Sequence, residues 1–439
     1  MKKQKQKISK KVYQAPKGMH DIFPPLIFYY EKLREICAIE GNFYGYKQIE
    51  LPILENKEVF EKGVGSNTDM IEKEMYVLKT KGGDELALRP EGTAGAARAY
   101  IQNGFNSLPQ PVKLWYFGQM FRHENPQAGR YRQFWQAGFE YFSAADPASD
   151  AELIYFADSL LRNFKLKNIF FEINSIGCNV CRPKYKKALK SYYRSRVKNL
   201  CSDCKARYIN NPLRLLDCKK ESCLVYKKNA PQVVDYLCKN CKIHFQEVLE
   251  YLDNFKISYV LNPYLVRGLD YYNRTVFEIA LSEKKLETEE DINTTLSLGG
   301  GGRYDYLVKY LGGEDTPALG LALGIDRIVE VLSVLKTWEF KDKPDVFIAQ
   351  IGKSAKNVFF ELLEKFRKSN IKVSFDLSRD SLKAQLGTAD KLGVKVVIIM
   401  GQQEVLTRTL VLRDMTQGTQ EIISINKVIE KVKEKLHTS

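Results

Sequence analysis

Two aromatic segments joined by a polar, basic stretch constrain the fold of this chain more than any other feature of its sequence. Residues 114–121 and 134–142 have strand-like composition, and Pro126 and Gly129 between them favour a loop. The sequence therefore predicts an antiparallel hairpin with a long basic tip. Side chains alternate faces along a strand. On the second strand this alternation places only hydrophobic side chains on one face, which we expect to pack into the hydrophobic core. The opposite face presents a ring, an amide, a position without a side chain and a carboxylate, from Phe134, Gln136, Gly138 and Glu140. This face is typical of a binding floor, although an ordinary half-exposed strand gives the same pattern.

A second polar run, residues 265–273, lies inside a segment that continues as a strand through residues 275–278. It contains a fixed cation, Arg267, a carboxylate, Asp270, and the neighbouring tyrosines Tyr271 and Tyr272. A strand needs none of this polarity to fold. A site that binds phosphate anions together with a small polar zwitterion needs all of it, and the run predicts such a site.

Two shorter segments also indicate a site for a charged, polar ligand. In residues 88–95, Glu91 and Thr93 flank a glycine, where both can meet the ammonium group of a ligand; the alternative is a helix start with Thr93 as N-cap. Residues 317–327 form a glycine-spaced apolar strand that leads into a helix carrying Arg327. Glycine lets backbone approach a nucleotide closely, but a tight strand–helix join gives the same pattern.

Taken together, these segments resemble the histidyl-tRNA synthetases of bacterial type, a family of class II aminoacyl-tRNA synthetases. The resemblance runs from residues 17–24 to the last helix. The three motifs of the class occur in order: a helix and strand with Pro52, the Arg122 hairpin, and the Arg327 strand–helix. The run around Arg267 and the segment 299–305 are the pair that is typical of histidine specificity.

The order of the expected elements predicts an α+β fold. Short strands mixed with helices favour a catalytic domain on an antiparallel sheet, formed by residues 17–177 and 258–335. Residues 345–400 show a β-α-β-α-β order, which predicts that the C-terminal domain, residues 345–439, contains a small, mostly parallel α/β sheet. The resemblance implies that this C-terminal domain binds the anticodon stem. A basic flexible tail, a cysteine-rich insertion and a linker complete the expected organisation, at residues 1–16, 178–257 and 336–344.

The resemblance also implies a two-step reaction. Histidine and ATP give histidyl-adenylate and pyrophosphate, with Mg²⁺ accompanying ATP, and the histidyl group then passes to the 3′ end of tRNA-His. Arg122 and Arg267 are the implied catalytic residues, because a guanidinium is permanently charged and presents a rigid donor fork.

Each implied ligand has its own set of residues. The histidine site combines carboxylates, an amide, hydroxyls and both arginines, from Glu91, Thr93, Arg122, Gln136, Glu140, Arg267, Tyr271, Tyr272 and Tyr304. Within it Glu140 would accept from the imidazole N–H and Tyr272 would pair with the other ring nitrogen. The ATP site comprises Arg122, Glu124, Arg130, Phe134 and Arg327. Phe134 and Arg327 would sandwich the adenine.

The tip of the hairpin departs from the family. Bacterial relatives read the extra 5′ guanosine of the tRNA with a basic residue before the proline and a glutamine after it. Gln127 is present here, but Asn125 stands at the basic position and supplies no charge. We expect Asn125 and Gln127 to contact the tRNA acceptor end, with a contact that is weaker or shifted to Arg130 or Arg132.

The insertion contains eight of the nine cysteines, in four close pairs: Cys178 and Cys181, Cys201 and Cys204, Cys218 and Cys223, Cys238 and Cys241. A reducing cytoplasm disfavours disulfides. Zinc binds four thiolates tetrahedrally, so these ligands can form up to two structural sites, and His244 can replace one thiolate. Spacing does not assign the pairing. Reduced thiols without metal and a redox-sensitive site are the alternatives.

Charge and hydropathy agree with the resemblance. The formal net charge of +15 suits a polyanionic partner. No apolar run is long enough to span a membrane, and the lysine-rich start lacks the apolar stretch of a secretory signal, so we expect a cytoplasmic protein. The resemblance implies a homodimer with residues 21–52 at the interface. Two alternatives are a catalytically silent, histidine-binding paralogue that regulates histidine biosynthesis and a basic nucleic-acid-binding module without enzyme activity.

Overall fold

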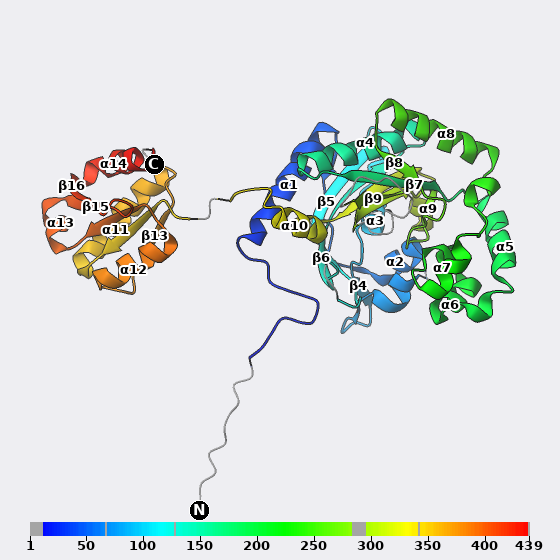
Figure 1. Ribbon diagram of the computed structural model, residues 1–439, viewed down its shortest axis with the longest axis horizontal. Helices are drawn as coiled ribbons and strands as arrows, with labels where there is room; N and C mark the ends of the chain where they lie inside the picture. The colour runs from blue at the N-terminus through cyan, green and yellow to red at the C-terminus, as the bar shows by residue number, and fades with distance from the viewer. Residues whose placement is uncertain (1–11, 66–67, 127–128, 283–295, 341–342, 438–439) are drawn as a thin grey trace, which may run out of the picture. The chain divides into compact units, whose positions relative to one another are not determined.

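The computed structural model describes residues 12–65, 68–126, 129–282, 296–340 and 343–437. The chain forms two compact units, Met1–Trp338 and Glu339–Ser439 (Figure 1). Each unit has its own hydrophobic core. The finer division into tail, catalytic segments, insertion and linker stays a prediction, and most of the expected tail, residues 1–11, lies outside the described residues.

An eight-stranded sheet forms the centre of the first unit. Its pairings are antiparallel except at the two edges, where the first and last pairs are parallel. The strands follow in the order β1 (Lys47–Gln48), β5 (Val112–Phe121), β6 (Gln133–Phe142), β11 (Ala318–Gly324), β10 (Leu296–Arg303), β9 (Asn273–Leu281), β7 (Ile169–Ser175) and β8 (Tyr259–Leu261). The predicted hairpin of β5 and β6 and the strand–helix join after β11 are confirmed.

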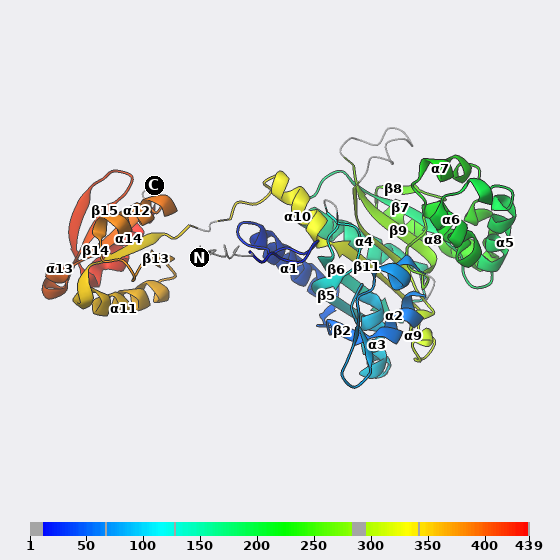
Figure 2. The ribbon, with the colours of Figure 1, turned by 90° about the horizontal axis from the view of Figure 1, so that it is seen from below.

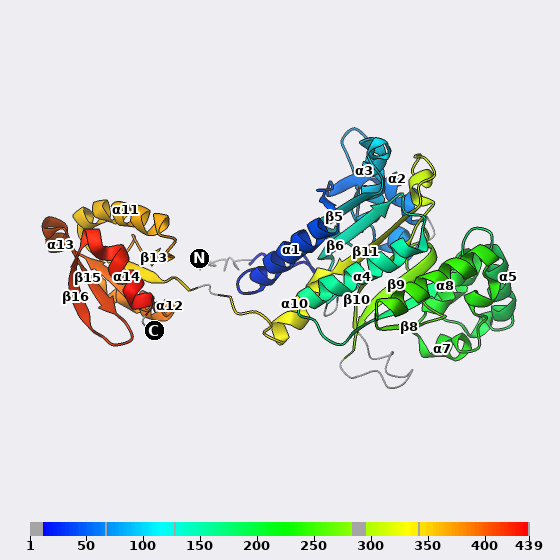
Figure 3. The same ribbon diagram turned by 90° about the horizontal axis from the view of Figure 1, so that it is seen from above.

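Helices cover both faces of this sheet (Figures 2 and 3). One face carries α1 (Leu26–Phe43), α4 (Pro147–Asn163) and α10 (Ile325–Val334). The other carries α2 (Lys57–Val64), α3 (Thr93–Gln102) and α9 (Leu307–Tyr310). A small antiparallel sheet of β2 (Leu54–Asn56), β4 (Glu85–Leu88) and β3 (Val77–Lys79) lies next to α2, with short helical turns at Met70–Glu74 and Phe105–Ser107.

Two local predictions are wrong. Residues 265–272 are not part of a strand but form turns before β9, because their backbone pairs elsewhere: the Asp270 N–H donates to the Val64 carbonyl at 2.9 Å. A helix does start in residues 88–95, as the alternative predicted, but Thr93 is not its N-cap. It is the first residue of α3, Gly92 occupies the cap position, and the Glu91 carboxylate accepts the hydrogen bonds of the first turn.

The cysteine-rich segment folds as a group of helices between β7 and β8. They are α5 (Arg182–Tyr193), α6 (Ser202–Asn210), α7 (Glu221–Lys227) and α8 (Lys239–Asn254), with 3₁₀ turns at Val197–Asn199, Pro212–Asp217 and Val233–Tyr236. Their shared core is small and contains six buried cysteines beside tyrosine and leucine side chains.

The second unit is a five-stranded sheet with helices on both faces. Its elements are β12 (Val346–Gln350), α11 (Gly352–Lys368), β13 (Val373–Phe375), α12 (Leu382–Leu392), β14 (Val396–Met400), α13 (Gln402–Thr407), β15 (Thr409–Asp414), β16 (Gln420–Ser424), a 3₁₀ turn at Ile425–Lys427 and α14 (Val428–His437). β12 pairs in parallel with β13 and β14, as expected. The later pairings, β14 with β15 and β15 with β16, are antiparallel. The whole sheet is therefore mixed rather than mostly parallel, because the chain adds a hairpin of two strands that the expected order did not include. Across the described parts of both units, no helix combines the length and apolarity needed to cross a membrane.

Candidate active site and cysteine clusters

Glu140, on β6, is fully buried in the first unit. Its carboxylate accepts hydrogen bonds from the hydroxyls of Thr93 (2.9 Å), Tyr116 (3.1 Å) and Tyr304. Burial raises the pKa of Glu140 to about 8, although the Tyr304 hydrogen bond opposes the shift; the neighbouring Glu91 carboxyl adds to it. A carboxyl that gains and loses its proton near neutral pH suits a ligand group that titrates in the same range, and imidazole is such a group.

The floor around Glu140 depends on a position without a side chain. Gly138 pairs with Tyr116 across β5 and β6, and a Cβ atom at Gly138 would lie 2.1 Å from Cζ of that ring. A Cβ atom at Gly92 would lie 2.2 Å from the same atom. Tyr116 therefore fills the gap in the sequence pattern and reaches Glu140 with its hydroxyl. Sequence reasoning missed Tyr116, and its place opposite Gly138 in the hairpin is the signal that could have found it.

Glu91 and Thr93 lie together at the start of α3, and both are buried. The Glu91 carboxylate accepts from the backbone N–H groups of Thr93 (2.6 Å) and Ala94 (2.8 Å), and the Tyr271 hydroxyl donates to it at 3.5 Å. Burial raises the pKa of Glu91, while these backbone hydrogen bonds oppose the shift. A helix N-terminus favours a negative charge, so the carboxylate is held in place beside the Glu140 network.

Three buried tyrosines, Tyr271, Tyr272 and Tyr304, form an aromatic wall. Their ring centroids lie 4.6, 5.6 and 6.5 Å apart. Burial raises the pKa of all three phenols, so they stay neutral and can donate hydrogen bonds. The predicted lining of the histidine site is thus brought together from the 265–272 loop and the segment after β10.

Arg267 lies at this wall. Its guanidinium carbon is 5.9 Å from the centroid of the Tyr272 ring, and Nη1 lies 3.5 Å from the Glu278 carboxylate. A Cβ atom at Gly300 on β10 would lie 2.5 Å from the Phe277 carbonyl oxygen and 2.7 Å from Nη1 of Arg267, so a side chain here would clash with the neighbouring strand and crowd the arginine. The glycine segment therefore contributes space for a cation.

The buried polar atoms that have no partner among the described residues include Oε1 of Gln136 and Nε of Arg267. A buried polar atom left without a partner costs about 1–3 kcal/mol. One is an acceptor and the other a donor. A ligand that carries both an ammonium and an anionic group would satisfy them.

Arg122 lies at the end of β5, near Phe134 at the start of β6. Its guanidinium carbon is 5.1 Å from the centroid of the Phe134 ring, and Nε donates to the Pro90 carbonyl at 2.8 Å. Glu124 lies between two cations, 3.8 Å from Nη1 of Arg122 and 3.9 Å from Nη1 of Arg130. Four of the five predicted ATP-binding residues are therefore neighbours.

The fifth, Arg327, donates to backbone carbonyls of two other segments, Gly129 (3.1 Å) and Ser297 (2.6 Å). The ring of Phe134 is covered by Arg122, and a sandwich of adenine between Phe134 and Arg327 stays a prediction. Of the two residues expected to contact tRNA, Asn125 is exposed at the hairpin tip and Gln127 lies outside the described residues.

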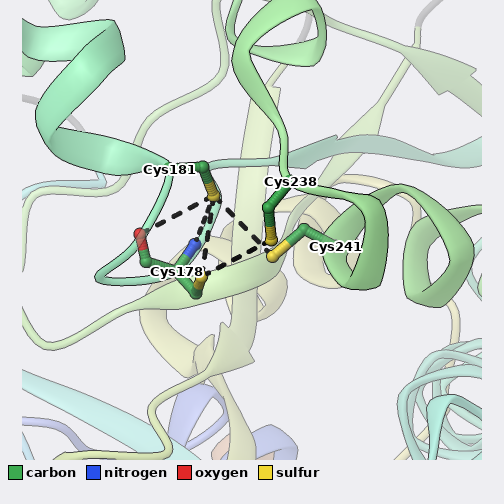
Figure 4. Close-up of side chains that lie close together, drawn as sticks. All are labelled: Cys178, Cys181, Cys238 and Cys241. Carbon is green, nitrogen blue, oxygen red and sulfur yellow. Dashed lines mark hydrogen bonds between the residues drawn. The ribbon is translucent and has the colours of Figure 1, made fainter.

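The eight cysteines of the insertion form two groups of four. Cluster A consists of Cys178, Cys181, Cys238 and Cys241, and cluster B consists of Cys201, Cys204, Cys218 and Cys223. The first and last pairs therefore meet, at the starts of α5 and α8 (Figure 4). In cluster A the Sγ distances from Cys178 to Cys181 and to Cys238 are 3.7 and 3.9 Å, and the distance from Cys181 to Cys241 is 3.8 Å.

His244 belongs to neither cluster. Its Nε2 lies 3.4 Å from the Asp150 carboxylate and its Nδ1 lies 3.5 Å from Nη1 of Arg274. The expectation that His244 can replace a thiolate is therefore wrong, because each cluster is complete with its own four cysteines.

Comparisons with known proteins agree with this geometry and with the motif resemblance. The family profile described as histidyl-tRNA synthetase matches residues 18–328, and the profile described as anticodon binding domain matches residues 345–435. The histidine–tRNA ligase of Thermodesulfovibrio yellowstonii is 42% identical over 97% of this chain and 99% of its own length. That of Desulforamulus reducens is 43% identical over 94% and 97%.

Solved structures give the same result. The apo histidyl-tRNA synthetase of S. aureus matches with a TM-score of 0.76 and 32% identity, covering 96% of this chain and all of its own. A Bacillus halodurans protein described as an ATP phosphoribosyltransferase regulatory subunit/histidyl-tRNA synthetase shares the fold, with a TM-score of 0.63 and 22% identity. The expected class II fold with an anticodon-binding domain is confirmed, and the chain belongs to the histidyl-tRNA synthetase family.

Proposed function

We propose that this protein is a histidine–tRNA ligase, which activates L-histidine with ATP and transfers it to the 3′ end of tRNA-His. The observation that carries the proposal is the buried Glu140 carboxyl, held by three hydroxyls beside a wall of tyrosines. An apolar amino acid has no use for such a group, whereas an imidazole presents one N–H and one acceptor nitrogen. Buried polar groups of this kind reject ligands that cannot pair with them.

In the proposed histidine site, Glu140 accepts from the imidazole N–H and Tyr272 pairs with the other ring nitrogen. Tyr304 orients the Glu140 carboxylate through its own hydrogen bond. Glu91, Thr93 and Gln136 hold the α-amino group, and the free Oε1 of Gln136 is the acceptor that supports this assignment.

Activation is a displacement at the α-phosphorus of ATP. A carboxylate oxygen of histidine forms a bond to phosphorus, the bond from phosphorus to the bridging oxygen of the β-phosphate breaks, and pyrophosphate leaves with that electron pair. Such a reaction depends on positioning and charge neutralisation rather than on a protein nucleophile. Arg122 bridges the histidine carboxylate and the α-phosphate, and Arg267 stabilises the developing charge from the other side. Each donor of this type contributes about 3–4 kcal/mol to the transition state.

ATP is proposed to lie along the Arg122 and Arg130 side of the site, with its adenine between Phe134 and Arg327. Mg²⁺ bound to ATP would neutralise phosphate charge. Glu124 lies beside Arg122 and Glu278 lies beside Arg267, and both carboxylates offer oxygen ligands of the kind that Mg²⁺ takes. The cysteine clusters are not part of this chemistry, so a metal bound there would be structural.

The tRNA is proposed to contact the hairpin tip at Asn125 and Gln127 and the anticodon-binding unit at residues 345–439. The formal charge of +15 supports binding of a polyanion. We place the reaction in the cytoplasm.

A homodimer is proposed, with residues 21–52 at the interface. This segment exposes large apolar side chains that a partner could cover: Phe23, Leu26, Ile39 and Phe43 are 69%, 43%, 59% and 80% exposed. Sedimentation equilibrium would test it, and a Phe43→Glu variant should shift the population toward monomer.

ATP–pyrophosphate exchange with each of the twenty amino acids tests the proposed function. We expect exchange with histidine alone, and its loss in the Arg267→Ala variant. A folded protein that binds histidine but exchanges with no amino acid would instead favour the silent regulatory paralogue. Nucleic-acid binding without histidine binding would favour the third class, a binding module without enzyme activity.

A further inference from the structure

The sulfur positions in cluster A match those of a tetrahedral metal site. Zinc binds thiolates at about 2.3 Å, so four sulfurs at the corners of a tetrahedron lie about 3.8 Å apart. The recorded distances in cluster A are 3.7, 3.8 and 3.9 Å, and Cys201 and Cys218 in cluster B are also 3.9 Å apart. All eight cysteines are free thiols, and these separations are far beyond the roughly 2.05 Å of a disulfide.

Cluster A is connected directly to the histidine site. Arg182 follows Cys181 in the chain and donates a hydrogen bond to the backbone carbonyl of Tyr272. One residue before Cys178, the Gly177 carbonyl accepts from the backbone N–H of Arg274 at 2.9 Å. The residues beside this cluster therefore hold the end of the 265–272 loop, which carries Arg267.

Cluster B reaches the same loop by another route. Asn211 lies between its two cysteine pairs, and its side-chain amide donates to the Asp270 carboxylate at 2.6 Å. Arg207, on the same helix as Cys204, donates to Asp69 at 2.8 Å. The 265–272 loop therefore accepts one hydrogen bond from a residue near each cluster. Arg182, near cluster A, donates to Tyr272, and Asn211, near cluster B, donates to Asp270.

We infer that the insertion binds two zinc ions, one in each cluster, and that the metal-bound insertion holds the Arg267 loop in its active position. The positioning part of this inference rests on the proposed function. Four helices of this insertion share a small core made partly of the cysteines themselves, and a core of that size needs a further constraint such as a metal. Metal binding supplies folding free energy because the site exists only in the folded state.

The first experiment measures metal content by mass spectrometry on the full chain purified without added metal. We expect two zinc ions per chain in the wild type, and one each in Cys178→Ser/Cys181→Ser and in Cys201→Ser/Cys204→Ser. Cys37→Ala, which alters the cysteine outside the insertion, is the matched control and should keep two. Iron in place of zinc, or no bound metal, would overturn the assignment.

The second experiment tests positioning through Arg182, which is not a ligand. Arg182→Ala should keep both zinc ions but lower kcat/KM for histidine about a hundredfold, the effect of misplacing catalytic groups by about 1 Å. Arg182→Lys, which can still donate to the Tyr272 carbonyl, should recover part of that loss. Lys184→Ala, an exposed cation on the same helix, should match the wild type.

The two experiments separate the ideas that they test. Arg182→Ala with two zinc ions and wild-type kinetics and histidine affinity would refute the positioning role, whether or not the cysteine variants fold. A wild type with two zinc ions that fails to exchange pyrophosphate with histidine would refute the proposed function and leave the metal sites standing. Calorimetric titration of histidine gives the affinity independently of turnover.

Discussion

Glu140 should make histidine binding depend on pH in a way that follows from its surroundings. Its pKa is about 8, against about 4.3 for an exposed glutamate and about 6.5 for a free imidazole. Near neutral pH the free protein therefore carries a proton on Glu140, and most free histidine has a neutral ring. In the complex the Glu140 carboxyl and the imidazole together carry one proton more than a carboxylate and a neutral ring would. This additional proton lies between the two groups, so binding requires it.

The magnitude follows from these two pKa values. Affinity is proportional to the protonated fraction of Glu140 multiplied by the neutral fraction of the imidazole. This product is largest slightly above about pH 7, and it falls about eightfold from about pH 7 to pH 9 as Glu140 loses its proton. Toward about pH 5.5 it falls by a similar factor, because the ring of free histidine becomes charged.

Isothermal titration calorimetry of histidine over this range, with wild type and Glu140→Gln, provides the assay. Glutamine has the same shape but does not titrate, so the variant should lose the alkaline fall that belongs to Glu140. The α-amino group of histidine titrates equally in both experiments and cancels in the ratio of affinities. A ratio that stays constant between about pH 7 and pH 9 would refute the assignment of Glu140 to the imidazole.

Stability gives an independent check on the same group. A folded-state pKa raised above the unfolded value means that the contribution of Glu140 is fully present below about pH 4.3 and is lost as the pH rises through about 8. Ligand-free wild type should therefore lose stability relative to Glu140→Gln between these pH values. An unchanged difference in melting temperature would contradict the raised pKa.

Three further variants test separate parts of the structure. Arg267→Ala should lower the rate of histidine-dependent pyrophosphate exchange at least about a hundredfold; a loss below about tenfold would remove Arg267 from the chemistry. Gly138→Ala places a Cβ 2.1 Å from the Tyr116 ring, so chemical denaturation should show a loss of about 1–3 kcal/mol, and an unchanged midpoint would contradict that contact. Asp150→Ala removes one of the two carboxylates paired with the fully buried guanidinium of Arg303 and leaves Asp305 at 3.2 Å; we expect a loss of up to about 3–5 kcal/mol, and a change within error would show that Asp305 alone neutralises the cation.

Several elements of this protein could be predicted because their signals are local. The aromatic strands around Pro126 predict the β5–β6 hairpin, and alternation along β6 puts Glu140 on the same face as Gln136. The same rule of alternation does not say which side chain lies above Gly138, because that depends on the register with the neighbouring strand. Tyr116 was missed for this reason.

The chemical class of the ligands was also predictable, because it follows from the residue types in each segment. Arginines, carboxylates and tyrosines in runs that a strand does not require indicate a site for charged ligands, whatever their final positions. Their partners were not predictable. Glu140 meets Thr93 and Tyr304 across 47 and 164 positions of sequence, and the contact of Arg122 with the ring of Phe134 joins residues at the ends of two strands.

The cysteines show most clearly which properties follow from the sequence and which follow from the tertiary structure. Sequence alone determined that four pairs with metal-ligand spacing lie in one insertion, because spacing within a pair is a local property. Only the tertiary structure decided that the first pair meets the last and the second meets the third, since ligands 60 residues apart, such as Cys178 and Cys238, are brought together by helix packing. Local patterns determine which groups a segment offers, and long-range packing determines which of them meet.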